Sequence, residues 1–173
     1  MGLIAARYNF QLVNSLLEST ITTLRNAGVG EGDIETLRVP GSNEIPQVVN
    51  LLAQSEQFDV MIALGVIIRG ETEHASLIAR TTAAGLQDVA MREEVAVING
   101  ILCVDTKEQA EARVGGEHQR GREFAHAALE MARLTHDLKL RVLDDMYGLG
   151  EDDDLFDELD DLDDTDDDGP ERP

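Results

Sequence analysis

Apolar residues fall along the chain in two patterns, short continuous runs and helical spacings. The longest run, residues 60–68, holds nine consecutive apolar or glycine residues. It is too short to span a membrane and too uniformly apolar for a half-exposed strand. We therefore predict a strand buried on both faces, as in a parallel sheet. Shorter apolar runs predict three more strands, at residues 2–6, 34–39 and 95–104.

The segments between these runs carry apolar residues at helical spacing. The first such pattern runs from Phe10 to Leu24, and Gly28 follows it as a glycine C-cap. Thr106 is a suitable N-cap for a later helix, with Gln109 as its capping-box partner. Four further helices are predicted. The first follows a loop at residues 40–46, and the second runs from Glu71 through His74 to about Leu86. The third follows Thr106, and the fourth runs from about Arg122 to Leu138.

Strands that alternate with helices predict an α/β fold with a four-stranded parallel sheet, because parallel neighbours need crossover connections. The chain of 173 residues is long enough for one such domain. We place this domain at residues 1–143 and an acidic tail at residues 144–173. A disordered, solvated tail is the simpler expectation. Four apolar residues at helical spacing leave open an amphipathic segment that docks a partner: Leu155, Phe156, Leu159 and Leu162.

Charge and cysteine content narrow the possible partners and compartment. The formal net charge is −21, and residues 151–173 account for −13 of it, with fourteen acidic residues against one arginine. Such an acidic chain argues against nucleic acid or an anionic membrane as a partner. Cys103 is the only cysteine, and its apolar run predicts a buried, unreactive thiol. Without a secretory leader pattern or a long apolar run, we expect a cytoplasmic protein.

The end of the longest apolar run carries the most informative chemistry. Arg69 and Gly70 stop the run, and the segment from Glu71 to His74 is expected to open a helix. The junction between a strand end and a helix start is where ligands bind in open α/β sheets. Free backbone N–H groups there suit an anion, and a histidine within reach can move protons.

Five segments of the sequence form an ordered set of motifs. They are residues 7–9 (RYN), 39–46 (VPGSNEIP), 63–74 (ALGVIIRGETEH), 99–110 with NGIL, DT and EQA, and 113–115 (RVG). With these motifs the sequence resembles one family, 6,7-dimethyl-8-ribityllumazine synthase, over roughly residues 2 to 140. The resemblance implies a flavodoxin-like three-layer α/β/α sandwich with no metal or redox cofactor.

The resemblance also implies a reaction and an assembly. The family condenses 5-amino-6-(D-ribitylamino)uracil with 3,4-dihydroxy-2-butanone 4-phosphate, releasing phosphate and water, in the penultimate step of riboflavin biosynthesis. Imine formation, phosphate elimination and ring closure are all proton-transfer steps. Subunits assemble into pentamers, in some cases into sixty-subunit icosahedral shells, and neighbouring subunits share each active site. The small-molecule substrates and further copies of the chain are therefore the expected partners.

The family motifs assign expected roles to individual residues. His74 occupies the position of the general acid and base. Gly70, Glu71 and Thr72 would offer backbone N–H groups to the substrate phosphate, and Arg113 of a neighbouring subunit would add a bidentate cation. The substrate pyrimidine and its ribityl chain would be bound by Tyr8, Ser42, Asn43, Glu44, Ile67 and Ile68, with Asn99 from the neighbour.

The sequence departs from the family pattern at several of these positions. Asn43 and Asn99 stand where many members have phenylalanine. Ala75-Ser76 replaces the usual aromatic and acidic pair after the histidine, and a common lysine has become Glu117 or His118. These changes leave open two alternatives to an active enzyme. One is a non-catalytic protein that binds a flavin or a lumazine, and the other is a shell or scaffold whose tail recruits a basic partner.

Overall fold

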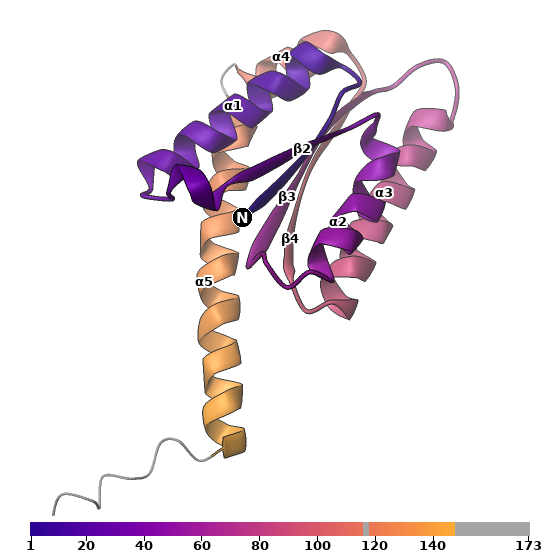
Figure 1. Ribbon diagram of the computed structural model, residues 1–173. Coiled ribbons are helices and arrows are strands. Elements are labelled where there is room, and N and C mark those ends of the chain that lie inside the picture. The colour runs from indigo at the N-terminus through magenta and orange to yellow at the C-terminus, as the bar shows by residue number, and fades with distance from the viewer. Residues whose placement is uncertain (116–117, 148–173) are drawn as a thin grey trace, which may run out of the picture. The chain divides into compact units, whose positions relative to one another are not determined.

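The computed structural model describes residues 1–115 and 118–147, in which four strands form one all-parallel sheet (Figure 1). The strand order is β2-β1-β3-β4. All four predicted strands are confirmed, and β2 and β4 each begin one residue later than predicted. Their bounds are Gly2–Ala6 for β1, Glu35–Val39 for β2, Val60–Ile68 for β3 and Ala96–Val104 for β4.

Within the described residues, five α-helices cover the two faces of the sheet. Helices α1, α4 and the first part of α5 pack on one face, and α2 and α3 pack on the other. This arrangement is the three-layer α/β/α sandwich that the resemblance implied. The helices are α1 (Phe10–Asn26), α2 (Ile45–Ala53), α3 (His74–Arg92), α4 (Lys107–Val114) and α5 (Arg120–Tyr147), with single 3-10 turns at Glu31–Asp33 (η1) and Ser42–Glu44 (η2).

The chain divides into two compact units, Met1–His136 and Asp137–Pro173. Helix α5 continues to Tyr147, so the predicted end near Leu138 was wrong. No glycine or proline interrupts the sequence before Gly148, which explains the longer helix. The predicted domain boundary at residue 143 stays a prediction, and the tail from residue 148 lies outside the described residues. Among those residues, no helix is both long and apolar enough to cross a membrane.

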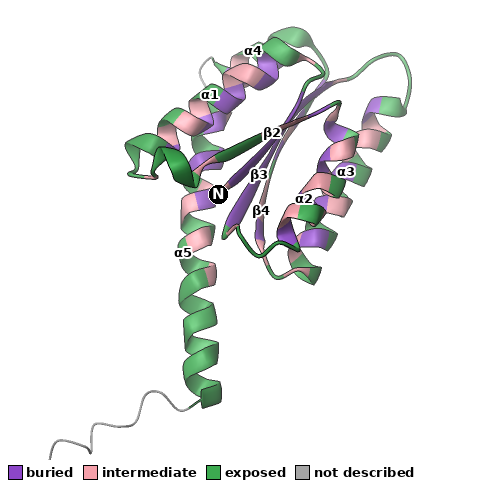
Figure 2. Cartoon of the chain, viewed as in Figure 1, coloured by how far each residue is buried: buried purple, intermediate pink, exposed green. Residues whose placement is uncertain are grey.

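Strand β3 is the centre of the hydrophobic core. Its residues from Val60 to Ile67 are all buried, as the uniform apolar run predicted (Figure 2). Successive side chains point to opposite faces, so Ile62 and Leu64 pack with α1 and α5, whereas Met61 packs with α2 and α3. One strand therefore contributes to both hydrophobic clusters.

Helix α3 begins at His74, not at Glu71 as predicted. The reason is a long-range contact that the local sequence does not show. The Arg69 N–H donates to the Val104 carbonyl oxygen at 2.8 Å, and the Arg69 guanidinium pairs with Asp105 at 2.9 Å. Both contacts hold Arg69 beside the end of β4, and the chain then bends at Glu71 and Thr72 before the first helical turn.

The predicted cap of helix α4 is present in a slightly different form. The Gln109 N–H donates to the Thr106 hydroxyl at 3.3 Å, as expected of an N-cap threonine. The Gln109 side-chain oxygen accepts from the Asp105 N–H at 2.9 Å, one residue before the position that a capping box uses. The two bonds together fix the start of α4.

Cys103 is exposed, so the prediction of a buried thiol was wrong. Strand β4 is at the edge of the sheet, and only one of its faces is fully covered. Leu102 and Val104 point into the core on the covered face, whereas Cys103 alternates to the other face. An apolar run on an edge strand therefore does not bury every residue in it.

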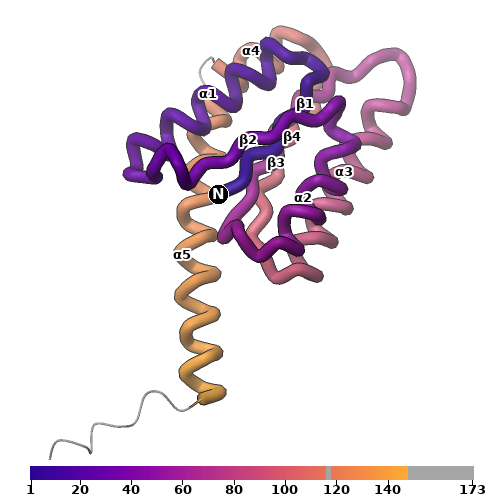
Figure 3. The backbone as a smooth tube through the Cα atoms, in the orientation of Figure 1, coloured from indigo at the N-terminus to yellow at the C-terminus, as the bar shows by residue number. Residues whose placement is uncertain are grey.

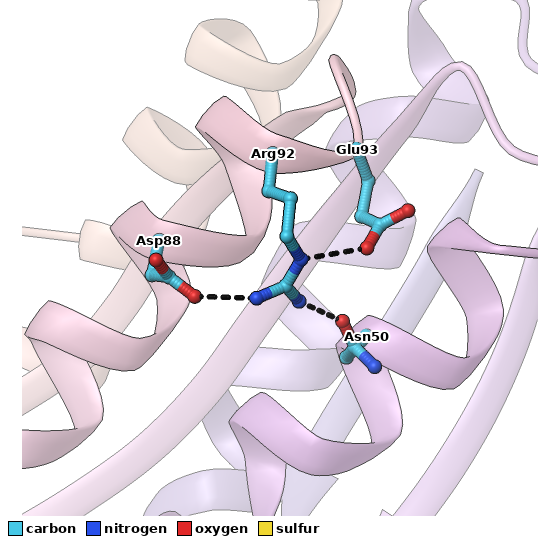
Figure 4. A network of polar contacts seen from close by, with 4 residues as sticks. All are labelled: Asn50, Asp88, Arg92 and Glu93. Atoms are coloured by element: carbon cyan, nitrogen blue, oxygen red, sulfur yellow. Dashed lines mark hydrogen bonds and ion pairs between the residues drawn. The ribbon is translucent and has the colours of Figure 1, made fainter.

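Helices α2 and α3 are joined at their ends by a polar network around Arg92 (Figure 4). The Arg92 guanidinium contacts Asp88 at 2.7 Å and Glu93 at 2.9 Å, and it also donates to the Asn50 side chain of α2. The hydrogen bond with Glu93 and the nearby carboxylate charges raise the pKa of Arg92 above its ordinary value. The network is solvent-exposed, so its electrostatic contribution to folding is small.

The contact between α1 and α5 depends on the absence of a side chain at Gly121. A Cβ there would lie 2.6 Å from the Leu16 carbonyl oxygen and 2.9 Å from the Ser19 Cβ. We expect Gly121→Ala to lower the free energy of unfolding by about 1–3 kcal/mol, because the two helix backbones must separate. Gly32→Ala is the control, since no atom lies within 4 Å of its Cβ position. Urea unfolding that gives equal stabilities for both variants would contradict this packing.

Candidate active site

A cavity of about 520 Å³ opens at the carboxyl ends of β1, β2 and β3, beside the start of α3. Figure 3 shows these strand ends converging at one edge of the sheet. Most of the predicted site residues line this cavity. The complete lining is Tyr8, Pro40, Gly41, Ser42, Asn43, Glu44, Val66, Ile67, Ile68, Gly70, Thr72, His74, Ala75 and Ile78.

The sheet register explains why loops far apart in sequence meet here. Strand β1 lies between β2 and β3, so the loops that follow these three strands are neighbours. The Arg7 N–H donates to the Val39 carbonyl oxygen at 2.7 Å, and the Tyr8 N–H donates to the Pro40 carbonyl oxygen at 3.1 Å. The ladder between β1 and β2 thus continues into the loops and holds Tyr8 beside Pro40.

Ser42 lies on the polar side of the cavity and is fixed by contacts with α3 and β3. It is buried, and its carbonyl oxygen accepts a 3.4 Å hydrogen bond from the Thr82 hydroxyl of α3. Gly65 of β3 lies directly against it, because a Cβ at Gly65 would be 2.4 Å from the Ser42 hydroxyl. Asn43 and Glu44 follow in the same 3-10 turn and present an amide and a carboxylate to the cavity. These groups can accept and donate hydrogen bonds to a polar ligand.

His74 is the first residue of α3 and is exposed at the mouth of the cavity. The first N–H groups of a helix have no partner within the helix, so His74 and its neighbours offer donors and a partial positive charge. The preceding Gly70 and Thr72 line the same wall. An anion and a proton-transfer group can therefore be accommodated next to each other.

Three predicted residues do not line this cavity. Glu71 is exposed, and its neighbours Gly70 and Thr72 line the wall instead. Arg113 belongs to α4 on the opposite face of the sheet, where its guanidinium donates to the Gln109 carbonyl oxygen at 3.0 Å. Asn99 is exposed on edge strand β4 and accepts from the Ile101 N–H at 3.1 Å. Within one chain, Arg113 and Asn99 are thus separate from the cavity.

Several residues around the cavity were missed by the sequence analysis. Val66 and Ile78 add apolar surface to its lining, and Ile78 lies one helical turn after His74. That i, i+4 spacing could have identified Ile78. Asn9 and Thr82 do not line the cavity, but their side chains hydrogen-bond the Val66 and Ser42 carbonyl oxygens. No local sequence signal predicts these two long-range bonds.

The arrangement suits a flat polar ligand that also carries an anionic group. Its floor is apolar, its rim carries hydroxyl, amide and carboxylate groups, and Tyr8 offers an exposed aromatic ring. In the described part of the chain, no three His, Cys, Asp or Glu side chains form a cluster suited to a metal ion. A second cavity of about 710 Å³, lined by polar residues of α1 and the start of α5, contains none of the predicted site residues.

The contact between Gly65 and Ser42 predicts a coupled effect on stability. Gly65→Ala should lower the free energy of unfolding by about 1–3 kcal/mol, because the new Cβ displaces the Ser42 hydroxyl. Adding Ser42→Ala should recover part of this loss, since it removes the atom that is displaced. Chemical denaturation of both single variants and the double variant measures the coupling. Strictly additive losses would mean that Ser42 is not the obstacle.

Comparison with known proteins identifies the family of the chain. A family model described as 6,7-dimethyl-8-ribityllumazine synthase matches residues 1–136. A protein of that name from Ralstonia pickettii (strain 12J) is 40% identical over 154 residues, which cover 89% of this chain and 88% of the relative. One from Xanthomonas oryzae pv. oryzae (strain PXO99A) is 44% identical over 134 residues, covering 77% and 87%. The chain therefore belongs to the 6,7-dimethyl-8-ribityllumazine synthase family.

Proposed function

We propose that this protein is an active lumazine synthase. It would condense 5-amino-6-(D-ribitylamino)uracil with 3,4-dihydroxy-2-butanone 4-phosphate, releasing phosphate and water, in riboflavin biosynthesis. One observation carries the proposal beyond family membership: His74 and eight of the substrate and phosphate positions expected from the family motifs line a single cavity. The biosynthetic role and the single cysteine support a cytoplasmic location.

We propose a position in the cavity for each part of the two substrates. The pyrimidine ring would stack on Tyr8 over the apolar floor, which includes Ile67 and Ile68. Ser42, Asn43 and Glu44 would bind the polar ring edge and the ribityl hydroxyls, because a carboxylate can accept several hydrogen bonds at once. The pyrimidine amine would then face the mouth of the cavity, where the second substrate enters.

The second substrate would bind with its phosphate at the start of α3. The backbone N–H groups of Gly70, Glu71 and Thr72, together with the first N–H groups of the helix, would donate to the phosphate oxygens. His74 would be close to the bonds that form and break. Its imidazole can take a proton from the pyrimidine amine and return protons during water loss, phosphate elimination and ring closure.

A homo-oligomer is part of the proposal because the cavity has no strong cation of its own. The described lining of the cavity includes no lysine or arginine. Arg69 is already paired with Asp105 at 2.9 Å. Arg113 and Asn99 would therefore come from a neighbouring copy, as in a ring in which each interface forms one site. We propose a pentamer, with a sixty-subunit icosahedral shell as the larger alternative.

A non-catalytic lumazine- or flavin-binding homologue is the second candidate. Ser76 stands where the family usually has an acidic residue, so the expected carboxylate partner of the imidazole is missing. Among the described residues, the His74 side chain has no hydrogen-bond partner. Tight binding of riboflavin without turnover would favour this candidate over an enzyme.

Replacing the proposed proton carrier tests the function directly. His74→Ala should slow lumazine formation by about ten- to a thousandfold, because general acid and base catalysis is lost while the cavity remains. Absorbance of the lumazine product measures the rate against the spontaneous reaction of the two substrates. His136→Ala is a matched control, since this exposed histidine lies in α5 and not in the cavity. Wild-type protein that produces no lumazine above the spontaneous rate would refute the proposal.

The shared site can be tested by mixing two inactive variants. His74→Ala and Arg113→Ala proteins should each have low activity, because each lacks one part of every site. Random reassembly of equal amounts should restore about a quarter of the wild-type sites, since His74 and Arg113 of one site come from different copies. Rates after denaturation and joint refolding are compared with those of each variant refolded alone. Activity that does not rise on mixing would place both residues in one subunit.

A further inference from the structure

Asn9, between Tyr8 and helix α1, uses its side chain in an unusual way. Its backbone is left-handed, with φ 55° and ψ 44°, a conformation that asparagine tolerates better than most residues. An asparagine before a helix normally caps the helix with its side-chain oxygen. Asn9 makes no such cap, and its side-chain amide instead donates to the carbonyl oxygen of Val66 at 2.8 Å. This bond connects the loop after β1 to β3.

The position of Val66 in the sheet explains what the bond replaces. Strand β3 pairs with β4 as far as Ile68 and Val104, but its register with β1 ends at the pair Ala5 and Leu64. Past that point, β3 has no strand partner on the β1 side. Val66 is 2% exposed, so an unpaired carbonyl oxygen there would be costly. The Asn9 amide supplies the missing donor.

The backbone around Tyr8 is held by hydrogen bonds on both sides, whereas its side chain is not held by packing. Its side chain is 72% exposed, so packing does not fix the ring. Its backbone N–H donates to Pro40 on the β2 side at 3.1 Å. The next residue, Asn9, is bound to Val66 on the β3 side. The loop that carries the Tyr8 ring is therefore tied to both walls of the cavity, by the Tyr8 backbone on the β2 side and by the Asn9 side chain on the β3 side.

We propose that Asn9 is a positioning residue that sets the distance between the Tyr8 ring and the cavity floor at Val66 and Ile67. The inference rests on the proposed function, in which the pyrimidine lies between this ring and the floor. Asn9 itself does not line the cavity. Its loss would widen the slot for the pyrimidine and leave the phosphate position at the start of α3 unchanged.

Two substitutions separate the hydrogen bond from the backbone conformation. Asn9→Gly keeps the left-handed backbone but removes the amide, and Asn9→Asp keeps the size but places an acceptor against the Val66 carbonyl oxygen. Both should raise the KM for the pyrimidine by about five- to tenfold, the effect of one lost hydrogen bond. The KM for the phosphate substrate and kcat should change by less than about twofold, within the ordinary context dependence of such a bond.

A double variant tests whether Asn9 acts through Tyr8. In a Tyr8→Ala background, Asn9→Gly should change the pyrimidine KM by less than about twofold. If Asn9 acts through the Tyr8 ring, the effects of the two substitutions are not additive, because the ring is already absent. Thr20→Ala is the control for general damage: it removes a 3.0 Å side-chain bond from α1 to the Gly121 carbonyl oxygen, away from the cavity. It should lower the melting temperature without changing either KM.

The outcomes distinguish the inference from the proposed function. An unchanged pyrimidine KM in Asn9→Gly, or an equal rise in both KM values, would overturn the role of Asn9. A full additional effect in the Tyr8→Ala background would also overturn it. Wild-type protein without turnover would instead refute the enzyme, and calorimetric titration of the same variants with the pyrimidine would then test Asn9 through Kd. Failure of the wild type to bind the pyrimidine would reject both.

Discussion

The burial of β3 on both faces is the constraint on which the rest of the structure depends. A strand with eight consecutive buried residues needs a helical layer on each side and a strand along each edge. The crossover connections supply those layers, and they place the loops after β1, β2 and β3 at one edge of the sheet. The position of the cavity is thus a consequence of how one apolar strand is covered.

The same constraint decides how well the local sequence predicts structure. Strand β3 has a partner strand on each side and a helical layer on each face, so the apolar run and the strand coincide from Val60 to Ile68. For β4 one edge is open, and Cys103 is exposed although its run is apolar. At the start of α3, helix-forming residues from Glu71 onward were overruled by the contacts of Arg69 with Val104 and Asp105. Local patterns predicted the strand correctly where both faces were buried. They failed where contacts with a distant segment determined the burial of a residue or the start of a helix.

The site shows a similar division between what motifs reveal and what they do not. Residues within the matching loops, such as Tyr8, Ser42 and His74, could be named from the sequence because the family resemblance marks them. Asn9 and Thr82 could not be given roles, because their partners are backbone carbonyls on other elements. Gly65 lies inside a matching segment, yet only the structure shows that it leaves room for Ser42. The supporting contacts of a site are tertiary, and one sequence does not reveal them.

Electrostatics supports the proposal that another copy of the chain completes the site. The described cavity lining contains Glu44 but no lysine or arginine, and the chain as a whole carries a formal charge of −21. An exposed helix N-terminus stabilises an anion by only about 0.3–1 kcal/mol. That contribution is small for a phosphate that shares the cavity with the Glu44 carboxylate. A guanidinium brought by a neighbour supplies charge and two directed hydrogen bonds at once. In the proposed homo-oligomer, the guanidinium of a neighbour would offset the acidic character of the subunit at the phosphate position.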